Sequence, residues 1–166
     1  MMGCNSTTKE PEKKSTEFFV GTYTDKESRG IYKYELSEEG IMKNLGLMAE
    51  SESPSFLAKS SDGKYLVAVN EISDAQNHGS LESYAILEDT LIFIDRKSSG
   101  GAHPCFVSID EEGFVLAANY TGGNVALLKL LENGELKELD MQIHQGKGST
   151  PRQEAPHAHS AWFSPN

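Results

Sequence analysis

The sequence of 166 residues predicts an all-β fold of repeated four-stranded units, which is the organisation of a β-propeller. The first observation is a repeat. The motif that begins at Ser53-Pro54 returns at His103-Pro104, fifty residues later, and a third copy begins at His157. The second is that each unit continues with short apolar runs separated by turn residues. The third is that no helical period lies between the runs. Tandem units of about fifty residues with four short strands each are typical of propeller blades.

In chain order, the expected strands fall into pairs. Residues 18–23 and 30–36 match the second and third strands of a unit, so the chain begins within a blade. Each of the next two units supplies one hairpin. The first pairs residues 65–70 with 79–84, and the second pairs residues 114–120 with 123–130. Turn dipeptides suited to positive φ mark the connections, and these are Asp62-Gly63, Gly122-Gly123 and Asn133-Gly134. The fold class is therefore a partial β-propeller, with about two complete four-stranded blades and two partial ones.

The first 17 residues differ in composition from the rest. Residues 5–17 contain no aliphatic or aromatic side chain, so we expect residues 1–17 to form a flexible tether before a folded domain at 18–166. The start, Met1-Met2-Gly3-Cys4, looks like the end of a bacterial lipoprotein signal without its apolar segment. It also fits a myristoylation pattern, or holds an incidental cysteine. A lipid on Cys4 would place the protein at the cell envelope; otherwise we expect it in the cytoplasm.

Charge and composition exclude several classes of partner. The net charge is −10, and no cluster of lysine or arginine is present, so binding to a nucleic-acid backbone is not expected. No apolar run approaches 18 residues, so no transmembrane helix is expected. The two cysteines, Cys4 and Cys105, lie about a hundred residues apart and do not indicate a disulfide framework. Cys105 stands where the first repeat has Ser55, and we expect it to be a buried small side chain rather than a nucleophile.

Several segments resemble the lactonase family, whose members include 6-phosphogluconolactonases. They are Val20-Gly21-Thr22-Tyr23-Thr24, Ala68-Val69-Asn70-Glu71, Gly101-Ala102-His103-Pro104-Cys105, Ala118-Asn119-Tyr120-Thr121-Gly122-Gly123, and Arg152-Gln153 with Pro156-His157-Ala158-His159-Ser160. The resemblance runs from Phe18 to Asn166 and depends on the order and spacing of these segments. It implies a seven-bladed propeller with a central channel, a bacterial hydrolase of carbohydrate metabolism, and a sugar lactone such as 6-phosphogluconolactone as substrate. It also implies kinship with muconate-lactonising cycloisomerases.

One cluster of residues is suited to opening a lactone. The reaction needs a base that activates water and donors that hold the developing oxyanion. His157 and His159 point to the same side of an extended segment, and Arg152 stands five residues before them. Histidine can act as the base, and a guanidinium can hold a carbonyl oxygen or a phosphate. We take these three residues, with Glu71, as the candidate catalytic group. The alternative is that the histidines only cap backbone groups between blades.

Other polar residues fall at equivalent places in the repeats. Asn70 and Asn119 end strands, Tyr120 follows one of them, and His103 matches His157, so these four are candidate substrate-binding residues. The asparagines could instead be turn formers. A single His-x-His pair without a third ligand is a weak zinc signal, so no metal or other cofactor is predicted.

The predicted function is hydrolysis of a sugar lactone by a carboxylic-ester hydrolase similar to 6-phosphogluconolactonase. The alternatives are a non-enzymatic propeller that binds a partner or acts as a scaffold, and a muconate-lactonising cycloisomerase. Because two full blades leave strand edges unpaired and the channel open, we expect the 166-residue chain alone to be inactive and to associate.

Overall fold

The computed structural model describes residues 15–164. Most of the expected tether and Cys4 therefore lie outside the described residues. The expected boundary at Phe18 differs slightly from the structure, because the first strand already begins at Thr16. The described residues form eleven strands and one short 3-10 helix. Their bounds are β1 Thr16–Val20, β2 Gly30–Leu36, β3 Met42–Glu50, β4 Leu57–Lys59, β5 Tyr65–Asn70, β6 Ser80–Ile86, β7 Leu91–Ser98, β8 Pro104–Ile109, β9 Phe114–Asn119, β10 Asn124–Leu130, β11 Leu136–Ile143 and η1 Pro151–Gln153.

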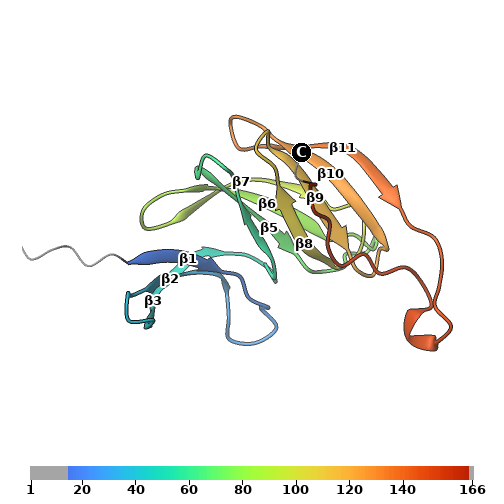
Figure 1. Cartoon of the computed structure of the whole chain (residues 1–166), viewed down its shortest axis with the longest axis horizontal. Coiled ribbons are helices and arrows are strands. Elements are labelled where there is room, and N and C mark those ends of the chain that lie inside the picture. Colours follow the sequence, from blue (N-terminus) through green and yellow to red (C-terminus); the bar gives the residue numbers. More distant parts are fainter. Residues whose placement is uncertain (1–14, 165–166) are drawn as a thin grey trace, which may run out of the picture.

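The strands build three successive antiparallel sheets (Figure 1). The first has three strands in the order β1-β2-β3, and the others have four each, β4-β5-β6-β7 and β8-β9-β10-β11. In every sheet, consecutive strands are hydrogen-bonded neighbours, so each is a simple meander. After β11 the chain returns past the third sheet, where the Ser108 hydroxyl donates to the carbonyl oxygen of Ala161 at 2.8 Å. The partial propeller with two full blades, expected from the sequence, is confirmed.

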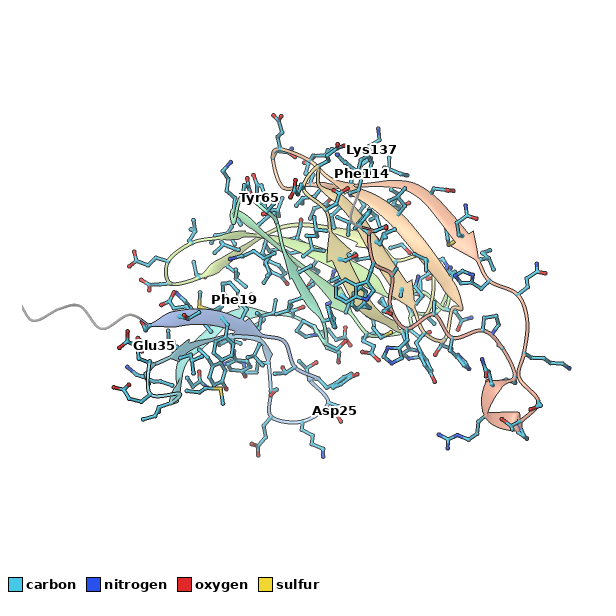
Figure 2. The ribbon with its side chains drawn as sticks, in the orientation of Figure 1. Phe19, Asp25, Glu35, Tyr65, Phe114 and Lys137 are labelled. Atoms are coloured by element: carbon cyan, nitrogen blue, oxygen red, sulfur yellow. The ribbon has the colours of Figure 1, made fainter. Side chains whose placement is uncertain are left out.

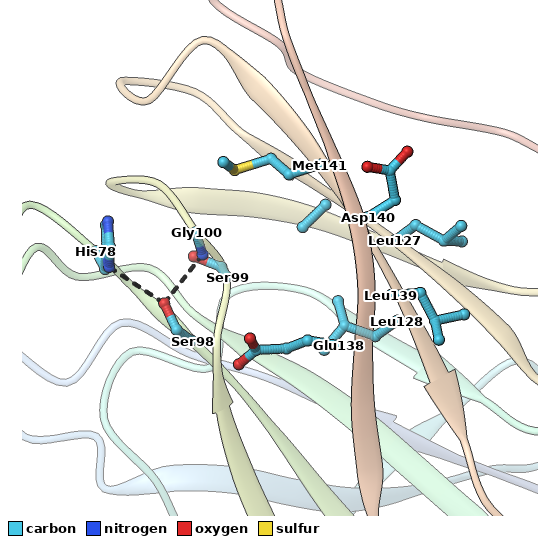
Figure 3. Close-up of a pocket in the computed structure, with 11 residues that line it drawn as sticks. His78, Ser98, Ser99, Gly100, Leu127, Leu128, Glu138, Leu139, Asp140 and Met141 are labelled. Carbon is cyan, nitrogen blue, oxygen red and sulfur yellow. Dashed lines mark hydrogen bonds between the residues drawn. The ribbon is translucent and has the colours of Figure 1, made fainter.

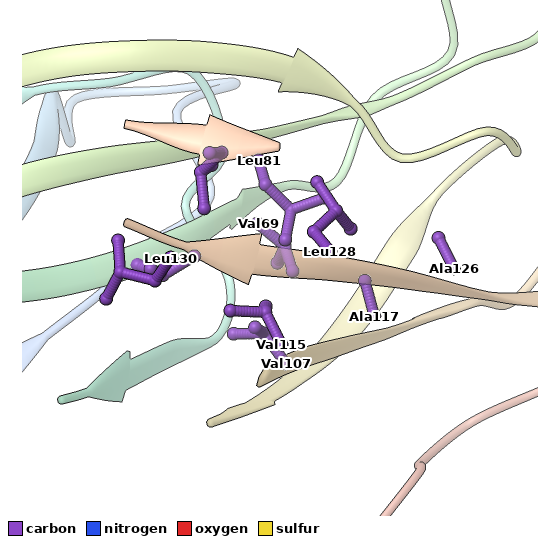
Figure 4. Close-up of a cluster of buried hydrophobic side chains, with 10 residues drawn as sticks. Val69, Leu81, Val107, Val115, Ala117, Ala126, Leu128 and Leu130 are labelled. Carbon is purple, nitrogen blue, oxygen red and sulfur yellow. The ribbon is translucent and has the colours of Figure 1, made fainter. Parts of the chain in front are cut away.

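The middle sheet is buried on both faces, and alternate residues of β5 pack into two different cores. Val67 and Val69 lie in a cluster shared with the third sheet (Figure 4), whereas Leu66 and Ala68 lie in a cluster shared with the first sheet. Successive side chains of a strand point to opposite faces. A strand covered on both faces therefore needs an unbroken apolar run, and β5 supplies it with the sequence Tyr-Leu-Val-Ala-Val.

Contacts at the ends of the strands lock neighbouring sheets together. Tyr65 at the start of β5 (Figure 2) reaches the third sheet, where its hydroxyl donates to the carbonyl oxygen of Glu132 at 2.7 Å. At the opposite end, a Cβ added to Gly79 would lie 2.2 Å from Cδ of Pro104, so only glycine fits there. The predicted turn glycines Gly63 and Gly123 lie between strands, with φ of 74° and 63° respectively.

A buried carboxylate joins the first sheet to the second. Glu82 of β6 is 2% exposed, and its Oε2 accepts hydrogen bonds from the hydroxyls of Ser51 and Tyr84 and, at 3.2 Å, from Nδ2 of Asn70. The other oxygen accepts from Nε of Arg96 at 3.0 Å. Burial alone would raise the pKa of Glu82, but these hydrogen bonds outweigh it and hold the pKa below its ordinary value. The carboxylate is thus ionised and fully paired.

We expect Glu82→Gln to lower the free energy of unfolding by about 1–3 kcal/mol, because the amide cannot accept from all four donors at once. The pKa of Glu82 is lower in the folded chain. The stability that ionised Glu82 contributes is therefore fully present above the pKa of the unfolded chain, about 4.3. It is lost as the pH falls through the lower pKa of the folded chain. Urea denaturation at pH 7 and at pH 3 measures both effects, with the exposed Glu27→Gln as control. Equal stability of the two variants at pH 7 would contradict this role.

Candidate active site

Three side chains occupy equivalent places at one edge of the three sheets. Glu71 follows β5 directly, and Tyr120 follows β9 directly. Tyr23 comes after Thr22, whose hydroxyl donates to the carbonyl oxygen of Gly30, the first residue of β2, at 2.8 Å. The residues that precede Glu71 and Tyr120 also lie opposite the first residue of the next strand. We call this edge, where Tyr23, Glu71 and Tyr120 leave the sheets, the rim.

The first part of the rim centres on the carboxylate of Glu71, which is half-buried. Its Oε2 accepts a hydrogen bond from the hydroxyl of Tyr23 at 2.8 Å and another from the hydroxyl of Ser55. The hydrogen bond to Glu71, together with burial, raises the pKa of Tyr23. Both neighbours therefore act as donors that fix one oxygen of the carboxylate. No described residue donates to the other oxygen, Oε1.

The second part of the rim is a cluster of one tyrosine and two histidines. The ring of His157 stacks on the ring of Tyr120, with 4.5 Å between centroids and 11° between planes. His159 meets the same tyrosine edge to face, at 5.6 Å and 86°. The two histidines that the sequence placed on one side of an extended segment are thus gathered around a single aromatic ring. His157 is half-buried and His159 is exposed.

The hydrogen bond of His157 determines which nitrogen is free. Its Nδ1 lies 3.0 Å from the backbone carbonyl oxygen of Tyr120. A carbonyl oxygen can only accept, so Nδ1 carries the proton. In the neutral ring the lone pair is then on Nε2, and no described residue occupies that nitrogen. His157 is therefore held by stacking and by a hydrogen bond, with Nε2 available as a base.

Cys105 lies between the two parts of the rim. Its Sγ is 3.6 Å from the carbonyl oxygen of His159 and 3.8 Å from that of Ala158. Burial, and after it the negative charge of Glu71, raises the pKa of the thiol. A raised pKa leaves little thiolate at neutral pH, which argues against a nucleophile, as the sequence analysis expected. The two parts of the rim are joined by backbone hydrogen bonds, from the N–H of His103 to the carbonyl oxygen of Ile72 at 3.0 Å and from the N–H of Tyr120 to that of His103 at 2.9 Å.

His103 belongs to the same rim. Its backbone N–H donates to the carbonyl oxygen of Ile72 at 3.0 Å, and its Nδ1 lies 3.0 Å from the hydroxyl oxygen of Thr121. Its φ is 52°, close to the φ of 45° at Ser53, the matching residue of the preceding repeat. This unusual backbone conformation recurs where the chain passes from one sheet to the next and turns the side chain toward the strand ends.

The two asparagines differ from the expectation that they line the site. Asn70 and Asn119 are both fully buried, with no exposed surface. Nδ2 of Asn70 donates to the carbonyl oxygen of Glu52 at 2.9 Å, and Nδ2 of Asn119 donates to that of Ser99 at 2.7 Å. As last residues of β5 and β9, they turn inward and satisfy backbone groups of the connections between sheets. They support the rim from behind rather than face a substrate.

Arg152 is not gathered with the histidines. It lies on η1, which projects away from the sheets (Figure 1), and it is exposed. It makes no hydrogen bond or ion pair with a described residue. The sequence analysis did not single out Tyr23 or Ser55 as functional residues, although the repeats align Tyr23 with Glu71 and Tyr120, and Ser55 with Cys105 and His159.

A separate groove of about 560 Å³ lies between the end of β7 and strands β10 and β11 (Figure 3). Its polar side includes Ser98, whose hydroxyl oxygen lies 3.3 Å from Nδ1 of His78 and accepts from the N–H of Gly100. None of the rim residues lines it. Within residues 15–164, no group of three potential metal ligands converges, and no helix has the length and apolar character needed to span a membrane.

Comparisons with known proteins identify the family. The sequence model of the family described as Lactonase, 7-bladed beta-propeller, matches residues 17–166. The chain is similar to the 6-phosphogluconolactonase of Bacillus subtilis, with 35% identity over 152 residues that cover 89% of this chain and 43% of the relative. Among solved structures it is similar to the periplasmic gluconolactonase PpgL of Pseudomonas aeruginosa, with a TM-score of 0.83, 29% identity, and coverage of 92% of this chain and 45% of that one.

A protein from Lactobacillus plantarum matches with a TM-score of 0.78 and 29% identity, over 87% of this chain and 42% of that one. The chain thus spans less than half the length of each of these relatives. The match to the family model extends over nearly the whole sequence and agrees with the three successive sheets. The chain belongs to the lactonase family of seven-bladed β-propellers.

Proposed function

We propose that the protein to which this chain belongs hydrolyses a sugar lactone, with the rim as part of its active site. The observation that carries this proposal is the arrangement of His157. Stacking on Tyr120 and a hydrogen bond to its carbonyl oxygen fix the ring, and the lone pair of Nε2 is left without a described partner. A fixed imidazole with a free nitrogen is suited to general-base catalysis near neutral pH. The names of the Bacillus and Pseudomonas relatives support lactone hydrolysis rather than cycloisomerisation or a scaffold role.

In this mechanism Nε2 of His157 removes a proton from water while the water oxygen attacks the lactone carbonyl carbon. The carbonyl oxygen becomes an oxyanion, and His159, whose ring contacts Tyr120 edge to face, is proposed to stabilise it as a hydrogen-bond donor. The bond between the carbonyl carbon and the ring oxygen then breaks. The ring oxygen takes up the proton that Nε2 of His157 had removed from water, which regenerates the neutral imidazole, and the product is the open-chain hydroxy acid. Tyr120 acts here as the positioning residue for both imidazoles.

The two named relatives differ in whether the lactone carries a phosphate. Arg152 stands five residues before His157 and is exposed. We propose that it binds the phosphate of a phosphorylated lactone, since a guanidinium forms paired hydrogen bonds with phosphate oxygens. Its place on η1 requires this short helix to approach the rim when substrate binds.

We expect His157→Ala to lower kcat for lactone hydrolysis by about 10²- to 10⁴-fold, because general-base catalysis contributes about that much. The assay uses a protein of the relatives' full length that contains this chain, with glucono-δ-lactone and its 6-phosphate as substrates. The matched control is His144→Ala, since His144 is exposed just after β11. If both variants retain full activity on both lactones, His157 is not the base.

We expect Arg152→Ala to raise KM for the phosphorylated lactone about tenfold or more, because a hydrogen bond between two charged groups contributes about 1.5–3 kcal/mol. KM for the unphosphorylated lactone should not change. Arg29→Ala, which removes an exposed guanidinium paired with Glu50 on the first sheet, is the control for the loss of one positive charge. A similar rise in KM for both lactones would argue that Arg152 contacts another part of the substrate.

A further inference from the structure

The two oxygens of the Glu71 carboxylate have different surroundings. Oε2 receives two hydroxyl donors, from Tyr23 and Ser55, whereas Oε1 receives no described donor. Oε1 is not among the enclosed polar atoms of the described residues, so a hydroxyl donor from outside the chain can reach it. The two donors come from different sheets. Tyr23 lies in the connection between β1 and β2 of the first sheet, and Ser55 lies just before β4 of the second. The carboxylate is therefore fixed in orientation, with one acceptor position open.

A carboxylate in this setting can act as a hydrogen-bond acceptor. The hydrogen bonds from the two hydroxyls occupy Oε2 and leave Oε1 for a further donor. An ionised oxygen accepts a hydroxyl hydrogen strongly, and such bonds are about twice as strong as those between neutral groups. Polyhydroxylated molecules such as sugars offer many hydroxyl donors. The open oxygen of Glu71 thus has the chemistry of a sugar-hydroxyl acceptor.

The ring of Tyr23 adds a second feature of the same kind. Its hydroxyl is bound to Glu71, yet the side chain is 56% exposed, so the ring presents a fixed, open face beside the carboxylate. A flat aromatic face next to a hydroxyl acceptor matches a sugar, which has an apolar face of C–H groups and a rim of hydroxyls. Backbone hydrogen bonds join Ile72, which follows Glu71, to His103 and His103 to Tyr120. The face of Tyr23 therefore lies on the same rim as the histidines that pack on Tyr120.

We propose that Glu71, Tyr23 and Ser55 form a subsite that binds the hydroxyl groups of the sugar lactone, with Oε1 of Glu71 as the acceptor. The inference rests on the proposed function and deepens it, because it assigns Glu71 to substrate recognition rather than to proton transfer. It also orients the substrate. The negative charge of Glu71 repels a phosphate, so the hydroxylated part of the lactone lies toward Tyr23 and an anionic part lies toward the histidines.

The test compares two lactones that share the same six-membered ring, one with hydroxyls and one without, namely glucono-δ-lactone and δ-valerolactone. The variants are Glu71→Gln and Tyr23→Phe, in a protein of the relatives' full length. The glutamine keeps an oxygen for Tyr23 and Ser55 but places an NH2 group where Oε1 was. The matched controls are Glu132→Gln and Tyr65→Phe, since Tyr65 bonds to the backbone of Glu132 at the far end of β5.

We expect both variants to lower kcat/KM for glucono-δ-lactone about tenfold or more, since each disturbs a hydrogen bond to a charged group. Hydrolysis of δ-valerolactone should change less than about twofold. An equal loss on both lactones would overturn the inference and place Glu71 at the reacting bond. No loss on either would also overturn it.

If the wild-type protein hydrolyses neither glucono-δ-lactone nor its 6-phosphate, the proposed function fails, and the subsite is then judged by binding alone. Titration calorimetry with sorbitol, an uncharged polyol, provides this measurement. Binding by the wild type that weakens about tenfold in Glu71→Gln supports the subsite. Equal binding by the two proteins, or none by the wild type, overturns it.

Discussion

Because both faces of the middle sheet are covered by neighbouring sheets, β5 has to serve two cores at once, with Val67 and Val69 on one side and Leu66 and Ala68 on the other. This constraint makes an unpaired charge on either face costly, whereas a small polar side chain such as Ser83, whose buried hydroxyl has no described partner, is still accommodated. Glu82 avoids this cost with donors from four residues, and it joins the first sheet to the second. The stacking of sheets and the placement of buried polar groups follow from the same two-sided burial.

Two-sided burial also determines where chemistry can occur. Just past the end of β5 the side chains of the middle sheet are no longer fully covered, and the repeat brings equivalent residues to one edge. Asn70 and Asn119 complete the strands and turn inward to satisfy backbone groups. The next residue in each case, Glu71 or Tyr120, is the first that can leave the sheet. The buried asparagines thus hold the backbone behind the rim residues in place.

The sequence alone predicted the all-β class, the repeated units and the turn glycines, because these depend on local patterns with a fixed period. It also placed His157 and His159 together, since residues two apart on an extended segment share a side. It could not show the stacking of His157 on Tyr120, which joins residues 37 positions apart across two units. Nor could it show that Asn70 faces inward, because the direction of a strand-end side chain depends on the neighbouring sheet. Tyr23 was overlooked for the same reason, since its partner Glu71 lies in the next sheet.

The rim holds two kinds of titratable group, and their hydrogen bonds indicate which of them accepts a proton. A carboxylate is often considered first as a base, but Oε2 of Glu71 already receives two hydroxyl donors, and only Oε1 is left for a further contact. His157 is in the opposite situation, because its one described hydrogen bond is made by the nitrogen that carries the proton. That bond fixes the ring and directs the lone pair to Nε2. The proposed roles, His157 as the base and Glu71 as the hydroxyl acceptor, therefore rest on which polar atoms are occupied rather than on the residue types.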